Sequence, residues 1–244
     1  KLYTKMGDRE KSQECIQWLT SHADALKSSY PSAYEPWDYE ALTMETNRIT
    51  LLHNPINTSN KEPWMWETVC HLMGTGKEVT VYTPYIICGK ERYADLTALC
   101  KNTDLVEIIT NDVASGANPW GCTDYLNQKK KIWATGVRVY EYLGEHSSHS
   151  KAVLIDDRMG IVGSYNMDMR STYQDTELML AVDSPELNAV IRKEAEVNKT
   201  YSRYMTPEGT YINGENYVPR EMSAGKKLFY GVLRVLIMPF RRFL

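Results

Sequence analysis

The stretch from residue 149 to 166, HSKAVLIDDRMGIVGSYN, constrains the fold of this chain more than any other part of its sequence. It contains two short apolar runs, residues 152–155 and 159–162, on either side of the polar triplet Asp156-Asp157-Arg158. Short apolar runs that are rich in β-branched residues and bounded by turn residues are typical of buried strands. The stretch therefore predicts a β-hairpin with its turn at residues 156–158.

Polar side chains lie at the open end of this hairpin. His149 and Lys151 are two residues apart on an extended strand, so their side chains share one face. Gly163 ends the second strand and allows the backbone to come close to whatever Ser164 and Asn166 contact. An imidazole, an ammonium, a hydroxyl and a carboxamide together suit an anionic group such as phosphate, where the imidazole can attack phosphorus or protonate a leaving oxygen.

The alternative explanation is a buried hairpin whose histidine is a satisfied core residue. That explanation usually holds for a lone histidine, but here it competes with the full pattern H-x-K-x4-D-x6-G-S-x-N. Average residue usage puts the chance occurrence of this pattern in a chain of this length at roughly one in 10⁵ or less. The pattern therefore favours a functional site.

The chain resembles the phospholipase D superfamily at every position of this pattern. Three further matches, Thr110-Asn111, Asp168-x-Arg170-Ser171 and Glu177, resemble companions of the motif in the bacterial cardiolipin synthase branch. The resemblance covers about residues 49–205. In such enzymes the motif occurs twice and the two copies share one active site, whereas this chain contains one copy.

The resemblance implies a phosphodiester hydrolase or phosphatidyltransferase that acts on phospholipids through a phosphohistidine intermediate. His149 and Lys151 would be catalytic, and Lys151, Ser164 and Asn166 would hold the phosphoryl oxygens. His149 would be the acid/base partner rather than the nucleophile if this is the second copy, although the sequence alone does not decide between the two roles. The resemblance implies no cofactor and no metal.

Two carboxylates near the hairpin have expected roles. Glu177 lies on the strand that should flank the hairpin, where it could accept a hydrogen bond from Nδ1 of His149 and so make Nε2 the reacting nitrogen. The alternative for Glu177 is a surface strand residue. Asp156 is expected to hold the turn or to pair with a cation such as Arg158 or Arg170, and Gly163 is expected to have a structural role.

Alternating strand and helix patterns predict an α/β fold. We expect a mixed sheet flanked by helices, an α-β-α sandwich of the phospholipase D type. Expected strands besides the hairpin are residues 49–53, 79–82, 105–109, 137–142 and 176–182, and expected helices are residues 62–72, 95–100, 123–134 and 185–204.

Ligands of such sheets collect beyond the carboxyl ends of the strands. Tyr85, Thr110 and Asn111 follow predicted strands and are therefore pocket candidates, with plain turns as the alternative. Residues 113–121 are expected to form a long exposed flap over the substrate.

Composition limits the remaining possibilities. The chain has 244 residues, 43% of them hydrophobic and 24% charged, which is ordinary for a globular protein. Its net charge of −3 argues against a general nucleic-acid binder, so nucleic acid is not the expected partner. Its five cysteines are dispersed, without a C-x-x-C pair, and suggest neither a disulfide framework nor a zinc site. A reducing compartment is expected.

Three regions are expected along the chain. Residues 1–48 should form a helix from Asp8 to about Lys27 and a connector, residues 49–205 the catalytic domain, and residues 206–244 a C-terminal extension. The chain starts without Met and carries one motif, so we expect it to be the C-terminal part of a longer protein. Its partner would then be the first-motif half of that protein or a second copy of this chain.

The last segment, residues 226–244, contains five basic residues and no acidic residue. Apolar side chains recur there at helical spacing, which predicts a basic amphipathic helix that Pro239 kinks or ends. The segment is too short to span a bilayer. It is expected to lie on an anionic membrane surface, with packing against another domain as the alternative. The run Lys129-Lys130-Lys131 is expected to be a solvated helix face. We therefore expect a peripheral protein on the cytoplasmic side of a bacterial membrane.

Two other functions stay open from the sequence. One-motif relatives that dimerise include nucleases, so a dimeric phosphodiesterase acting on nucleic acid is the alternative enzyme. A different possibility is an inactive half that only binds lipid. The head group, the acceptor alcohol and the choice between hydrolysis and transfer do not follow from the sequence.

Overall fold

The computed structural model describes residues 9–56, 62–115 and 118–244 of the chain. These residues form two compact units, residues 1–43 and residues 44–244. In the first unit, α1 (Arg9–Ser29) is followed by the short helices η2 (Pro31–Tyr34) and α2 (Tyr39–Leu42). The expected helix is thus present and runs to Ser29, while its expected first residue, Asp8, lies outside the described residues. The expected connector contains two short helical turns that the sequence did not predict.

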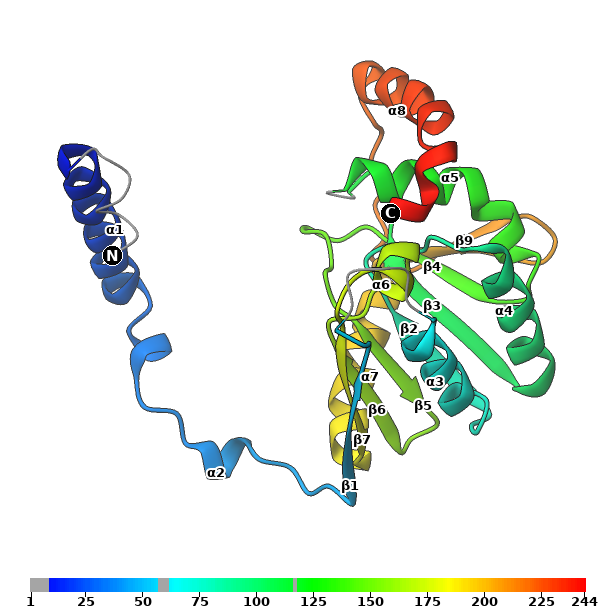
Figure 1. Cartoon of the computed structure of the whole chain (residues 1–244), viewed down its shortest axis with the longest axis horizontal. Helices are drawn as coiled ribbons and strands as arrows, with labels where there is room; N and C mark the ends of the chain where they lie inside the picture. The colour runs from blue at the N-terminus through cyan, green and yellow to red at the C-terminus, as the bar shows by residue number, and fades with distance from the viewer. Residues whose placement is uncertain (1–8, 57–61, 116–117) are drawn as a thin grey trace. The chain divides into compact units, whose positions relative to one another are not determined.

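The second unit is built on one mixed sheet of nine strands in the order β1-β7-β6-β5-β2-β3-β4-β8-β9 (Figure 1). The strands are β1 (Arg48–His53), β2 (Glu78–Tyr82), β3 (Leu105–Asn111), β4 (Arg138–Tyr142), β5 (Ala152–Ile155), β6 (Met159–Gly163), β7 (Leu178–Asp183), β8 (Ser202–Met205) and β9 (Tyr211–Asn213). β2, β3 and β4 are parallel, and the remaining pairs are antiparallel. The sheet is therefore mixed, as expected.

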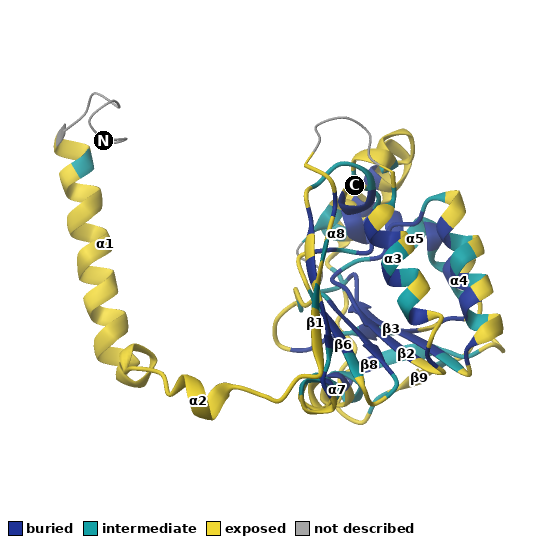
Figure 2. Ribbon diagram, turned by 60° about the horizontal axis from the view of Figure 1, so that its bottom comes forward, coloured by how far each residue is buried: buried dark blue, intermediate teal, exposed yellow. Residues whose placement is uncertain are grey.

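Helices cover both faces of this sheet (Figure 2). The helices of the second unit are α3 (Trp64–Met73), α4 (Lys90–Asn102), α5 (Pro119–Trp133), α6 (Met169–Tyr173), α7 (Pro185–Thr200), α8 (Ala224–Leu236) and η3 (Met238–Phe243). The larger core cluster joins the sheet to side chains of α3, α4 and α5. α7 packs on the opposite face, where Ala195 meets Tyr82, Ile109 and Ala152. The predicted α-β-α sandwich is confirmed.

The topology brings several strand ends to one edge of the sheet. β2, β3 and β4 end there, because they are parallel neighbours. β5 and β7 begin there and β6 ends there, because each is antiparallel to its neighbour. This edge, which we call the motif edge, therefore carries the residues just before β5, just after β6 and just before β7. The rule that ligands bind beyond strand ends applies to this edge.

The hairpin turn is held by Asp156, which has a positive φ of 47°. Its carboxylate accepts hydrogen bonds from the backbone amides of Lys77 and Glu78 at 2.8 and 2.9 Å. Holding the turn was one of the two expected roles of Asp156. The other, an ion pair with Arg158 or Arg170, is not made within the described residues, because Arg158 pairs with Asp183 and Arg170 with Asp175.

The expected flap at residues 113–121 is shorter than the sequence suggested. Asn118 accepts hydrogen bonds from the backbone amides of Trp120 and Gly121, and Pro119 occupies the first turn, so α5 starts at Pro119. Residues 116–117 lie outside the described part of the chain. The remaining loop residues, Val113 and Ala114 among them, are largely buried or half-buried.

The last expected helix and the domain boundary after it also differ from the structure. α7 ends at Thr200, and residues 202–205 form β8 rather than a further turn of helix. β8 pairs with β4 on one side and β9 on the other, so the sheet continues past residue 205. The extension expected at residues 206–244 therefore belongs to the same compact unit as the catalytic domain.

Candidate functional site

The loop that carries His149 is fixed to the motif edge by Asn111, at the end of β3. Asn111 donates hydrogen bonds to the carbonyl oxygens of Pro84 and Ser148, at 2.9 and 2.8 Å, and accepts one from Ser148 N at 2.8 Å. The segment after β6 is tied to the end of β2 in a similar way, because Met167 N donates to Thr83 Oγ1 at 3.1 Å. These bonds hold the loops after three strands in one group.

His149 and Lys151 are in direct contact. Lys151 Nζ lies 2.8 Å from His149 Nδ1 and 3.2 Å from Nε2, and it donates to His149 O at 2.7 Å. An ammonium can only donate, so the ring nitrogen that accepts this hydrogen bond is unprotonated. Partial burial and the adjacent charge of Lys151 lower the pKa of His149 below its ordinary value. The contact with Lys151 and the lowered pKa both favour the neutral form of the imidazole.

Lys151 lies in a half-buried position. Burial lowers the pKa of its ammonium below the ordinary value, and the nearby carboxylates of Glu177 and Asp168 partly offset this effect. The backbone oxygen of Lys151 accepts a hydrogen bond from Gly163 N at 3.4 Å, which places Lys151 opposite the end of β6. The backbone at Lys151 is thus paired with the end of β6, just before Ser164.

Glu177 contacts a different partner from the one expected. Its buried carboxylate accepts a short hydrogen bond from Ser164 Oγ, and Ser164 Oγ in turn accepts one from Leu178 N at 3.0 Å. The expected hydrogen bond to His149 is not among the contacts of the described residues, since both ring nitrogens of His149 face Lys151. Glu177 therefore orients Ser164 and supports the charge of Lys151.

Asn166 presents an unused hydrogen-bonding group at the site. Its Nδ2 donates to Ser171 Oγ at 3.4 Å, whereas its buried Oδ1 has no hydrogen-bond partner within the described residues. A buried polar atom without a partner is rare in a folded protein. The oxygen and nitrogen of a carboxamide are nearly interchangeable in shape, so the group can turn a donor toward a ligand oxygen.

A hollow of about 190 Å³ lies beside His149. It is lined by Pro84, Tyr85, Asn111, Asn118, Cys122, Ser147, Ser148 and His149. Two of the three pocket candidates, Tyr85 and Asn111, thus lie where the sequence placed them. Thr110 does not, because it is buried within β3 and is not part of this lining.

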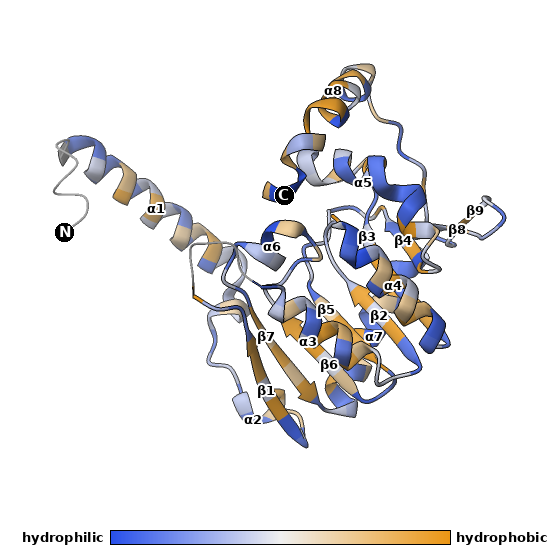
Figure 3. Ribbon diagram, turned by 45° about the vertical axis from the view of Figure 1, so that its right-hand side comes forward, coloured by the Kyte–Doolittle hydropathy of each residue, from blue (hydrophilic) through white to orange (hydrophobic). Residues whose placement is uncertain are grey.

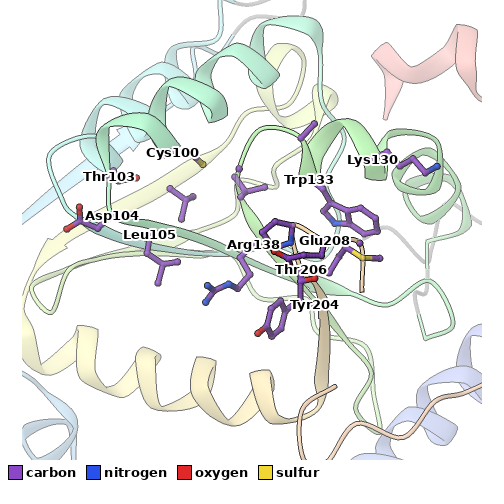
Figure 4. Close-up of a pocket in the computed structure, with 17 residues that line it drawn as sticks. Cys100, Thr103, Asp104, Leu105, Lys130, Trp133, Arg138, Tyr204, Thr206 and Glu208 are labelled. Carbon is purple, nitrogen blue, oxygen red and sulfur yellow. The ribbon is translucent and has the colours of Figure 1, made fainter. Parts of the chain in front are cut away.

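A larger hollow of about 930 Å³ lies far from the motif, at the opposite ends of β3 and β4 (Figure 4). Residues of α4, α5 and the β8–β9 hairpin surround it, including Cys100, Trp133, Arg138 and Glu208. No residue of the motif contributes to its lining. We place the candidate site at the smaller hollow, because His149 and the ends of β2 and β3 line it and Lys151 contacts His149 directly.

The sequence did not predict a role for Arg92. Its buried side chain holds the loop after β6 by hydrogen bonds. This buried guanidinium donates to Ile87 O at 3.2 Å, to Tyr165 OH at 2.9 Å and to Thr172 Oγ1, and it lies 4.5 Å from the centroid of the Trp66 ring. No local pattern marks Arg92, because its partners are distant in the sequence. Asn118 and Cys122 were also missed, although the Asn118-Pro119 pair is a helix-start signal that could have placed them.

The described residues contain no group of three or more His, Cys, Asp or Glu side chains placed to hold a metal ion. No helix among them is both long enough and apolar enough to cross a membrane.

Solved structures with the same fold define the class of this domain. A phospholipase D family member, Nuc from Salmonella typhimurium, matches with a TM-score of 0.53 at 13% identity, over 64% of this chain and 97% of its own. The phosphatidylserine synthase of Haemophilus influenzae matches with a TM-score of 0.52 at 18% identity, over 80% of this chain and 47% of its own. The fold is therefore of the phospholipase D type.

Sequence comparison gives the family. Residues 69–198, more than half of the chain, match the family described as "Cardiolipin synthase, PLD-like domain". The chain belongs to this family, within the phospholipase D superfamily. It is similar to cardiolipin synthase A of Erwinia tasmaniensis (27% identity over 108 residues, 44% of this chain) and of Yersinia pseudotuberculosis (26% over 157 residues, 63% of this chain). The matches span 21% and 30% of the length of these relatives.

Proposed function

We propose that this chain provides one half of the active site of an enzyme that transfers or hydrolyses phosphatidyl groups. The observation that carries the proposal is the contact between His149 and Lys151 on the motif edge, where the ammonium holds the imidazole neutral. A neutral imidazole can attack phosphorus or take a proton at neutral pH. The family, with its cardiolipin synthase relatives, supports phospholipid as the substrate class.

The residues around His149 are suited to a phosphoryl group. The Lys151 ammonium offers charge and N–H donors to its oxygens. Asn166 has an amide that no described residue satisfies fully, and Ser164 has a hydroxyl fixed by Glu177. Donors fixed before the reaction stabilise the charge that develops in the transition state without reorganisation.

The reaction that we propose has two steps and needs two imidazoles. In the first step, a neutral imidazole attacks phosphorus through its ring nitrogen, the P–O bond to the leaving group breaks, and the second imidazole, which enters this step as the imidazolium, gives its proton to the leaving alkoxide. In the second step, the second imidazole removes the proton of an alcohol or water, whose oxygen attacks phosphorus while the P–N bond breaks. We assign one of these roles to His149 and the other to the imidazole of a second motif.

The second motif would come from another part of a longer protein or from a second copy of this chain. An open face beside the motif edge supports such a partner. Leu51 and Leu180 form a cross-strand pair there, and with Ile49 and Leu178 they are 41% to 57% exposed. Further along the same face, α7 packs on β3, β4, β5, β6 and β8. An uncovered apolar sheet face next to an incomplete site fits a partner domain.

We further propose that the enzyme works on the cytoplasmic side of a bacterial membrane. All five cysteines are free thiols, including Cys15, which is exposed. Free thiols are typical of reducing compartments. The bacterial relatives named above support the bacterial assignment.

The test is the substitution His149→Ala in the assembled enzyme, with both motif halves present. Loss of a positioned acid, base or nucleophile should reduce turnover of phosphatidylglycerol in detergent micelles by at least about a hundredfold. The matched control is His146→Ala, because His146 lies in the same loop and its side chain is 87% exposed. Circular dichroism should show both variants folded.

Two results would contradict the proposal. Full turnover in His149→Ala would remove the imidazole from the mechanism. Equal losses in His149→Ala and His146→Ala would indicate that the loop, and not the imidazole, matters.

A further inference from the structure

The C-terminal helices leave an unusual amount of apolar surface uncovered. On α8, the exposed apolar residues are Leu228, Phe229, Val232, Val235 and Leu236, each 53% to 71% exposed. On η3, Met238, Phe240 and Phe243 are 53% to 62% exposed. The chain has only three phenylalanines, and all three are in this exposed set. Figure 3 shows α8 as a largely hydrophobic helix at one end of the unit. We call these eight residues the C-terminal apolar surface.

This surface is separate from the face that attaches α8 to the fold. α8 packs on α5 through the buried side chains of Tyr230 and Leu233, and Ile237 follows at its C-cap. At 100° per residue, these three positions span a sector of about 60°, and the five exposed apolar positions of α8 span a different sector of about 120°. A helix that only needed to pack on α5 would carry polar residues in the second sector. The apolar character of that sector therefore requires another partner.

Basic residues flank the C-terminal apolar surface. Residues 224–244 contain Lys226, Lys227, Arg234, Arg241 and Arg242 and no acidic residue. Arg234 and Lys227 lie on a third sector of α8, between the buried sector and the exposed apolar sector, and Lys227 and Arg242 are exposed. An exposed apolar stripe with basic side chains on one side of it matches the boundary between acyl chains and anionic head groups.

The helix is fastened close to the hollow that holds His149. The phenol of Tyr230 is hydrogen-bonded to the thiol of Cys122, which lines this hollow. Arg234 Nε donates to Asn127 Oδ1 at 2.8 Å, and Asn127 Nδ2 donates back to Arg234 O at 2.8 Å. α8 and α6 lie at the same end of the sheet in Figures 1 and 3. A partner bound to the C-terminal apolar surface is thus held beside the motif edge.

We propose that α8 and η3 form a docking surface for an anionic lipid bilayer, into which the C-terminal apolar surface inserts at the head-group level. The positive charge of α8 and η3 favours an anionic lipid surface as the partner. A protein surface with a mixture of acidic and basic residues would complement this charge less well. Docking through this surface brings the hollow beside His149 to the lipid head groups. The inference concerns membrane binding alone and does not depend on the chemistry at His149.

The first test removes apolar character without changing charge. The double variant Leu228→Gln/Leu236→Gln changes two exposed residues of α8 in the full 244-residue chain. Its binding to phosphatidylcholine vesicles with one quarter phosphatidylglycerol, measured by co-sedimentation, should weaken at least about tenfold. The matched control, Val190→Gln/Val197→Gln, changes two residues of α7 that are 51% and 47% exposed, and its binding should stay within about twofold of the parent.

The second test changes charge at exposed positions. Lys227→Gln and Arg242→Gln should each weaken binding to the same vesicles by roughly fivefold at low salt, since each basic residue near an anionic surface contributes to binding. The matched controls Lys101→Gln and Lys193→Gln remove the same charge from exposed positions on α4 and α7. They should have little effect. The parent should also bind pure phosphatidylcholine vesicles much more weakly, and lose affinity as salt is raised.

Three results would overturn the proposal. The first is parental vesicle binding by Leu228→Gln/Leu236→Gln. The second is binding that is indifferent to phosphatidylglycerol and to salt. The third is a change of oligomeric size in the apolar double variant, on gel filtration, with unchanged vesicle binding, which would make the C-terminal apolar surface a protein interface.

Discussion

At the residue scale, the two-residue spacing of His149 and Lys151 sets the chemistry of the site. It puts an ammonium 2.8 Å from a ring nitrogen, and that charge opposes protonation of the ring. The imidazole should therefore stay neutral to a lower pH than an ordinary histidine, whose pKa is about 6.5. The neutral form is the one that the proposed attack on phosphorus, or removal of a proton from the acceptor, requires.

A titration of His149 checks this account. Removal of the cation in Lys151→Met should raise the pKa of His149, although the ring stays partly buried, so its pKa should remain below the ordinary value. The imidazole C–H signals of His149, followed by NMR against pH in parent and variant, measure the shift. An unchanged pKa would mean that the charge of Lys151 does not reach the ring. Lys101→Met, in which an exposed lysine of α4 is changed, is the control.

The sequence predicted correctly that the motif residues converge at one site. It did not predict which of their side chains form hydrogen bonds with one another. The pattern from His149 to Asn166 has a fixed spacing, so the pleat of two strands dictates that its polar groups converge. The partner of Glu177 is decided by side-chain conformation, and Ser164 on the neighbouring strand is closer to it than His149. Arg92 was missed because its partners Tyr165 and Thr172 are more than 70 residues away.

At the element scale, the end of β6 depends on the absence of a side chain at Gly163. A Cβ there would lie 2.1 Å from the backbone oxygen of Leu178 and 2.8 Å from Cα of Met179. Backbone atoms of a paired strand cannot move aside as a flexible side chain can. Gly163 therefore sets how closely β6 approaches β7, and with it the position of Ser164.

Substitution of this glycine should be costly. Gly163→Ala should lower the free energy of unfolding by about 2 kcal/mol, the usual size of an overpacking penalty. Gly160→Ala is a matched control in the same strand, because a Cβ there would meet only side chains of Leu187 and Ile191, 3.6 to 3.8 Å away. Urea denaturation of both variants gives the two values. Equal costs would show that the close approach to β7 is not what requires glycine at 163.

Elements with local signals were predicted well, and elements defined by distant partners were not. β2, β3 and the hairpin have clear apolar runs. β8 is a four-residue strand, Ser202–Met205, and its pairing with β4 is visible only in the fold. A turn signal did exist at Thr206-Pro207-Glu208-Gly209, where Gly209 has a φ of +84°, and it marks the hairpin between β8 and β9.

At the scale of the whole molecule, the proposed reaction needs a second imidazole, and the open face of β1 and β7 is where we expect its carrier to bind. Leu51→Glu/Leu180→Glu places two charges on this exposed face. The change should leave the fold stable, because both side chains are already exposed, but should reduce both assembly and phosphodiester turnover at least about tenfold. Sedimentation velocity combined with an activity assay measures both effects.

A control on another exposed apolar residue completes this test. Val218→Glu changes a side chain that is 73% exposed and distant from the open face, and it should affect neither assembly nor turnover. A strictly monomeric preparation of the parent that turns over substrate as fast as the assembled enzyme would contradict the requirement for a second motif.

The sequence predicted the fold class of the molecule but not where its sheet-containing unit ends. The expected boundary after residue 205 falls in a hairpin that joins the sheet, because β9 and the C-terminal helices complete the same unit. Residues 224–244 are basic and lack acidic residues, unlike the rest of the chain. This change of composition marks a different kind of surface on the same unit and not the start of a separate domain.

The fastening of the tail to α5 has a mechanical consequence. Arg241 Nε donates to Asp124 Oδ1 at 2.8 Å, and Asp124 is fully buried and also bonded to Gln128, whose Oε1 accepts from Cys88 N. Detaching the tail would leave a carboxylate in the interior without its cation, at a cost of roughly 3 to 5 kcal/mol. A tail attached in this way is a rigid arm and not a flexible tether. On a bilayer bound through the proposed docking surface, such an arm would fix the rotational orientation of the sheet as well as its distance from the lipid.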